Sequence, residues 1–229
     1  MNQALHGFLS AKLGDPSLLS SDRTKALEIA LVATGAKPAW LWESIDPEGQ
    51  SCPEAIPLAI EFVAALEQAG WAVRHTHLNR PLPLGLVGVL MRPIMGEHYP
   101  AVHYDAVVAA PEVVAADRLL AAYRAARPKR TRAGEIALGA ALGYPPHATR
   151  NPGLPRLTEL CLPEAPGAED LWICGFVDDQ SGRREATTWL STWASAMAAE
   201  FPGLWPLPKL ADETGPGHPA HRQCSAHPH

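Results

Sequence analysis

Apolar residues recur every three or four positions along six stretches of the chain, which is the spacing of one face of an α-helix. In the second stretch Leu27 and Leu31 share such a face. Gly35 marks its end, because glycine accepts the left-handed conformation that terminates a helix, and Pro38 cannot continue one. We predict helices over residues 2–13, 22–35, 57–70, 112–126, 131–142 and 183–200.

Other stretches alternate between the two faces of a strand or are apolar throughout. In residues 71–78, His75 and His77 share one face with Trp71 and Val73. Residues 84–91 are almost continuously apolar, which favours a strand covered on both faces and placed next to 71–78. Strands are therefore predicted over residues 39–42, 71–78, 84–91, 101–109 and 171–177.

These elements predict a mixed α/β fold of the α+β type. A single globular domain would cover residues 1–205, with a central sheet of about five strands flanked by helices. A small three-layer sandwich fits the same order of elements equally well. The six prolines between residues 145 and 166 predict a long loop, and the Pro-, Gly- and His-rich residues 206–229 predict a flexible tail.

The composition is that of a globular protein outside the membrane. Hydrophobic residues make up 47% of the 229 residues, enough for a substantial core, and the net charge is −5. We see neither a signal peptide nor an apolar stretch of the ~18–20 residues that a membrane helix needs. The four cysteines are widely spaced, without a C-x-x-C pair. We expect a soluble, cytoplasmic protein with reduced thiols and no membrane partner.

Histidines in the middle of the chain are candidates for a metal site. His75 and His77 project from one face of a predicted strand, and His103 on another predicted strand could complete a set of three ligands for a divalent metal such as zinc or iron. The alternative is that these are half-exposed histidines with ordinary hydrogen bonds, because ten histidines in the chain make chance spacings common.

Positive charge is concentrated between two predicted helices. Five basic residues fall within residues 124–132, among them Arg127 and Arg130. They could bind a phosphate or an acidic protein, aided by the positive end of the helix that begins near Thr131. A solvated, charged loop is the alternative. Nucleic acid is not the expected partner, because aromatic residues are not interleaved with the basic ones.

The segment 143–151 follows the fifth predicted helix and gathers four different polar groups. Gly143 and Pro145 stop that helix. Beyond them Tyr144 and His147 are candidate catalytic residues, and Arg150 and Asn151 are candidate ligand-binding residues, because a guanidinium and an amide can hold an anion while an imidazole moves a proton. A helix stop followed by a polar loop explains the same residues.

The sequence therefore favours a small-molecule function without fixing a reaction. We predict a protein or enzyme that binds an anionic ligand near residues 143–151, with Arg127 and Arg130 as further ligand-binding residues. The alternative is a non-catalytic adaptor that binds an acidic protein, or nucleic acid, through residues 124–132. The nucleotide-binding glycine motifs and the G-x-S-x-G nucleophile motif are absent, and no set of residues resembles a family that we know.

Overall fold

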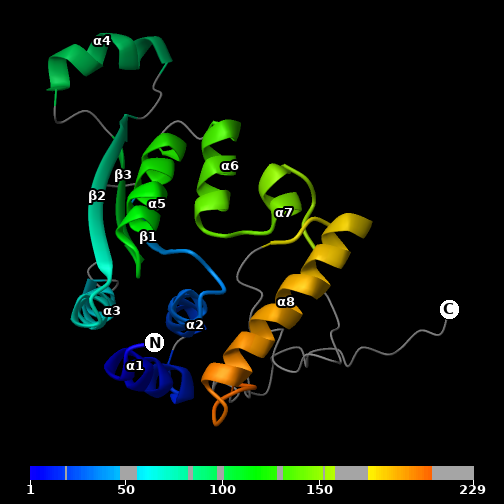
Figure 1. The fold of residues 1–229 in the computed structure, drawn as a ribbon. Coiled ribbons are helices and arrows are strands. Elements are labelled where there is room, and N and C mark those ends of the chain that lie inside the picture. The colour runs from blue at the N-terminus through cyan, green and yellow to red at the C-terminus, as the bar shows by residue number, and fades with distance from the viewer. Residues whose placement is uncertain are drawn as a thin grey trace, which may run out of the picture. The chain divides into compact units, whose positions relative to one another are not determined.

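The computed structural model describes residues 1–18, 20–46, 56–81, 85–96, 101–127, 131–151, 153–157 and 175–207. Within these residues it has eight helices and one three-stranded antiparallel sheet, so the mixed α+β class is confirmed (Figure 1). Contacts divide the chain into unit 1, formed by Met1–Lys37 and Pro145–His229, and unit 2, formed by Pro38–Tyr144. The single domain over residues 1–205 stays a prediction.

Unit 2 contains the sheet. Its elements in chain order are β1 (Trp40–Asp46), α3 (Ile56–Gln68), β2 (Ala72–Pro81), α4 (Gly85–Met95), β3 (Ala101–Ala110), α5 (Val113–Ala126) and α6 (Arg132–Ala141). The strand order is β1-β3-β2, and both pairings are antiparallel. The predicted strands 39–42, 71–78 and 101–109 are confirmed as β1, β2 and β3.

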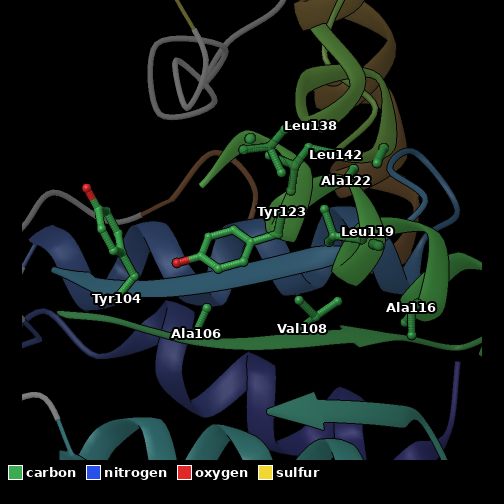
Figure 2. Packing of buried hydrophobic residues seen from close by; sticks show 13 residues of the cluster. Tyr104, Ala106, Val108, Ala116, Leu119, Ala122, Tyr123, Leu138 and Leu142 are labelled. Atoms are coloured by element: carbon green, nitrogen blue, oxygen red, sulfur yellow. The ribbon is translucent and has the colours of Figure 1, made fainter. Parts of the chain in front are cut away.

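The core of unit 2 lies between one face of the sheet and α5 with α6. Ala106 and Val108 of β3 are buried there against Leu119 and Tyr123 of α5, and Figure 2 shows these side chains facing one another. The opposite face of the sheet meets α3 near the start of β1, where Phe62 packs against both Trp40 and Trp42. The strand β1 therefore has one face toward the core and part of the other face covered by α3.

Two glycines allow close approaches inside unit 2. A Cβ atom on Gly134 would lie 2.7 Å from the Cα atom of Ala126, so the absence of a side chain at this glycine lets the backbone of α6 approach the end of α5 closely. Gly143 has a φ of +71° and lies against the ring of Pro38. Its left-handed conformation ends α6 as the sequence predicts.

One predicted strand is wrong. Within the predicted strand 84–91, residues 85–91 fall in the helix α4 and residue 84 lies outside the described residues; Val89, Leu90 and Ile94 of this helix are exposed. A short apolar run has no period that separates a strand from a helix, and the directly paired β2 and β3 leave no place between them for another strand. The described residues hold three strands rather than about five. Most of the predicted strand 171–177 lies outside the described residues, and Val177 forms a single bridge with Arg156.

Unit 1 is helical in the residues that the structure describes. It contains α1 (Gln3–Gly14), α2 (Ser20–Ala33), α7 (Pro146–Arg150) and α8 (Gln180–Glu200). The helix α2 contacts both α1 and α8, and α7 packs on α8. The long helices were predicted; the short α7, inside the proline-rich loop, was not. None of the helices described in either unit is long and apolar enough to span a membrane.

Candidate functional site

The predicted site at residues 143–151 is built around the start of α7. Pro146 is the first residue of this helix and has no N–H group, and the next two N–H groups donate to a side chain of α8. The N–H of His147 lies 2.8 Å from Oε1 of Glu185, and that of Ala148 lies 3.2 Å from Oε2. Glu185 thus occupies the amino-terminal end of α7, where an anionic ligand would otherwise be attracted.

The ring of His147 is held on both sides. Its Nε2 lies 2.8 Å from Oδ2 of Asp179, and its Nδ1 lies 3.4 Å from Nδ2 of Asn151, which also donates to the backbone carbonyl of His147 at 3.0 Å. This pattern assigns the proton to Nε2, which donates to Asp179, while Nδ1 accepts from Asn151. The imidazole therefore links α7 to the start of α8.

Asp179 accepts hydrogen bonds from two different helices at this junction. Its carboxylate accepts a hydrogen bond from the backbone N–H of Gly182 at 2.7 Å and so caps α8. The same carboxylate accepts a hydrogen bond from the ring Nε2–H of His147. The hydrogen bond from Gly182, and to a smaller extent the one from His147, holds the pKa of Asp179 below its ordinary value. Arg156, which sequence reasoning did not single out, donates to the backbone carbonyls of Ala148, Asn151 and Gly175.

The other residues of this predicted site divide between the units. Tyr144 belongs to unit 2, where it packs against the core, and His147, Arg150 and Asn151 belong to unit 1. Arg150 is exposed, and Asn151 is bonded to His147. Catalytic roles for Tyr144 and His147, and ligand binding by Arg150 and Asn151, stay predictions. The structure adds a structural role for His147 and Asn151.

Two of the basic residues in 124–132, Arg124 and Arg127, bond to other side chains of unit 2. Arg127 is 11% exposed and pairs with Glu43 at 3.0 Å and with Glu135 at 2.6 Å. Burial opposes its charge, but the hydrogen bond and the charge of Glu43 outweigh burial and raise the pKa of Arg127. Arg124 donates to Thr76 at 3.2 Å. Arg130 lies outside the described residues, so its predicted role, like the adaptor function, stays a prediction.

A further polar site lies on the sheet of unit 2, on the face opposite α5. The register places His77 of β2 opposite Asp105 of β3, and Nδ1 of His77 lies 2.6 Å from Oδ1 of Asp105. The two side chains are 53% and 59% exposed. His75, two residues earlier on β2, is exposed and shares this face because side chains alternate along a strand. We call His75, His77 and Asp105 the open-face cluster.

The predicted metal ligands are partly brought together by this arrangement. His75 and His77 share the face as expected. His103 of β3 pairs in register with Asn79, next to the pair formed by His77 and Asp105, but its side chain lies outside the described part of the chain. Among the described residues, no group of three His, Cys, Asp or Glu side chains could hold a metal ion.

Asp105 is the site residue that the sequence analysis missed. The signal that could have found it is the pairing of residues 71–78 with 101–109, because an antiparallel register places a residue of one strand directly across from a residue of the other. The hydrogen bond from Nδ1 of His77 to Asp105 assigns the proton to Nδ1 and the ring lone pair to Nε2. A neutral imidazole oriented in this way is the usual form of a metal-binding histidine.

Comparison with known proteins adds no family. The chain matches no protein-family model, and neither a curated protein nor a solved structure is significantly similar to it.

Proposed function

We propose that unit 2 binds a divalent transition-metal ion at the open-face cluster, with His75 and His77 as ligands and Asp105 as the residue that orients His77. The observation that carries the proposal is the 2.6 Å hydrogen bond between Nδ1 of His77 and Asp105. A carboxylate that accepts from one ring nitrogen fixes the tautomer and raises the basicity of the other nitrogen, and this pairing accompanies most histidine ligands of metals.

The chemistry of the cluster favours zinc, nickel or copper over magnesium or calcium. Imidazole nitrogen suits the first group, whereas the second prefers sites made mainly of oxygen. His75 and His77 are both exposed on one strand face, so an ion can reach them without a change in the fold. The negative charge of Asp105 beside the site also favours a cation.

A site with two protein ligands leaves coordination positions for other groups. His103 is the predicted third ligand from the neighbouring strand, and water or a small anion would occupy what remains. This links the metal proposal to the anionic ligand that the sequence favours, because an exchangeable position on such an ion binds carboxylates and polarises carbonyl groups. The proposed function is thus metal-dependent binding of a small ligand.

The experiment is calorimetric titration of the full chain with Zn²⁺ near neutral pH. The background protein carries alanine at the histidines and the cysteine of residues 218–229, because a tail rich in these residues binds metals weakly and unselectively. In this background we expect His77→Ala to remove most of the binding. Asp105→Asn should weaken it about 10- to 100-fold, the usual effect of losing an outer partner of a metal-binding histidine.

The matched control is His147→Gln. His147 also bonds an aspartate, at 2.8 Å, but its second nitrogen is engaged by Asn151, and it should not bind the ion. Zinc affinity that is the same in His77→Ala and in the background protein, or that is lost in His147→Gln instead, would contradict the proposal.

A further inference from the structure

A buried arginine in unit 1 has two of its three guanidinium nitrogens without a partner in the described part of the chain. Arg23, the fourth residue of α2, is 4% exposed. Its Nε and Nη2 atoms are both buried and have no hydrogen-bond partner among the residues that the structure describes. The acidic residues close to it on the same helix do not supply one: neither Asp22 nor Glu28 bonds these atoms, and Glu28 pairs with Lys25 at 3.1 Å.

This state is costly for a guanidinium and contrasts with Arg127. A buried charge is normally paired, because the protein interior replaces its hydration poorly. Arg127 follows that rule with two carboxylates, Glu43 and Glu135. Arginine remains charged at any ordinary pH, so Arg23 cannot avoid the penalty by losing a proton. An anion that pairs with it would remove the penalty.

The two unpartnered atoms specify the shape of that anion. Nε and Nη2 lie on one edge of the guanidinium and donate two parallel N–H bonds, the fork that matches the two oxygens of a carboxylate or a phosphate. We propose that Arg23 is the centre of an internal binding site for a small oxyanion.

This site is independent of the open-face cluster. Arg23 belongs to unit 1, and its ligand is an anion, whereas the cluster of unit 2 would bind a cation. Carboxylate and phosphate share the fork chemistry, so the experiment includes both. The probes are sodium phosphate and sodium acetate, each titrated into the full chain at constant ionic strength maintained with chloride.

The readout is the Nε–H resonance of Arg23 in a proton–nitrogen NMR spectrum, assigned by its loss in Arg23→Lys. We expect the resonance to shift with phosphate, acetate or both, and a response to phosphate alone would identify a phosphoryl ligand. In calorimetry, Arg23→Met should weaken anion binding about 10- to 100-fold, which is the loss expected for hydrogen bonds to a charged group.

The control is Arg183→Met, which removes an arginine that is 56% exposed and pairs with Asp178. It should leave anion binding unchanged. If neither anion shifts the Arg23 resonance, or if Arg23→Met binds both anions as tightly as the unchanged chain, Arg23 is not an anion site. The NMR titration needs only the unchanged chain and the assignment variant, so it decides the question even if Arg23→Met does not fold.

Discussion

The network around Arg127 gives the sharpest test of how unit 2 is held together. Nε of Arg127 donates to Oε1 of Glu43 at 3.0 Å, Nη1 donates to Oε1 of Glu135 at 2.6 Å, and the hydroxyl of Tyr123 donates to Oε1 of Glu43 at 3.1 Å. The network joins β1, α5 and the first turn of α6. Replacing Arg127 by methionine keeps most of the side-chain volume and removes the charge and the donors.

The expected loss follows from the exposure of each partner. Breaking a fully buried ion pair costs about 3–5 kcal/mol, because the remaining charge has no partner. Glu43 is 19% exposed and Glu135 is 33% exposed, so water relieves part of that cost, mainly at Glu135. We therefore expect Arg127→Met to lower the free energy of unfolding by about 2–3 kcal/mol, most of it at Glu43.

Urea denaturation followed by circular dichroism measures the loss. The matched control is Arg74→Met, which breaks the pair between Arg74 and Asp117, whose side chains are 36% and 55% exposed. An exposed pair contributes at most ~1 kcal/mol. Arg127→Met leaves the charge of Glu43 without its partner, and Glu43→Gln removes that charge. The loss in the free energy of unfolding caused by Arg127→Met should therefore be smaller in the Glu43→Gln protein than in the unchanged chain. If Arg127→Met costs no more than Arg74→Met, the network does not stabilise unit 2 and the reasoning fails.

Two further predictions concern single residues. Burial, together with Glu43, raises the pKa of Tyr123, so its contribution to the free energy of unfolding is complete below pH ~10 and is lost as the pH rises above that value. In denaturation curves, Tyr123→Phe should reduce this alkaline loss by up to ~1.4 kcal/mol per pH unit. An unchanged slope would contradict the raised pKa of Tyr123. A Cβ on Gly182 would overlap the carbonyl of Val177, so Gly182→Ala should lower the melting temperature. Gly7 lies inside α1 with open space around it, so Gly7→Ala should raise the melting temperature through a gain of ~0.5–1 kcal/mol in the free energy of unfolding. A higher melting temperature for Gly182→Ala than for Gly7→Ala would refute both expectations.

Six of the eight helices in the described residues could be predicted from the sequence, because their periodicity and their end signals agree. Thr131 accepts the N–H of Gly134 at 3.1 Å, and Gly143 has a φ of +71°, so α6 begins and ends at residues with a physical reason. The residues 84–91 had no such signals, and their apolar character alone was consistent with a strand. The prediction of a strand covered on both faces fails, because the apolar side chains Val89, Leu90 and Ile94 of α4 are exposed and do not belong to a core.

The same error hid the carboxylate of the open-face cluster. Alternation along residues 71–78 placed His75 and His77 on one face, as the structure has them. Their carboxylate partner could not be found while residues 84–91 were taken as the neighbouring strand, because Asp105 faces His77 only when β2 pairs directly with β3. Likewise, the sequence counts the charges of residues 124–132 but not their partners, and Glu43 is 84 positions from Arg127.

The segment 143–151 shows why polar residues at a helix end are ambiguous. A ligand-binding loop and a helix junction both need donors and acceptors that point toward unsatisfied backbone groups. In unit 1 the carboxylate of Glu185 meets the start of α7, and His147 lies between Asp179 and Asn151, so each of these groups already has a partner. A ligand that used His147 as a base would have to displace Asn151 from Nδ1. His77 differs in its surroundings, because its partner Asp105 holds the ring on a face of the sheet where the histidine side chain is 53% exposed.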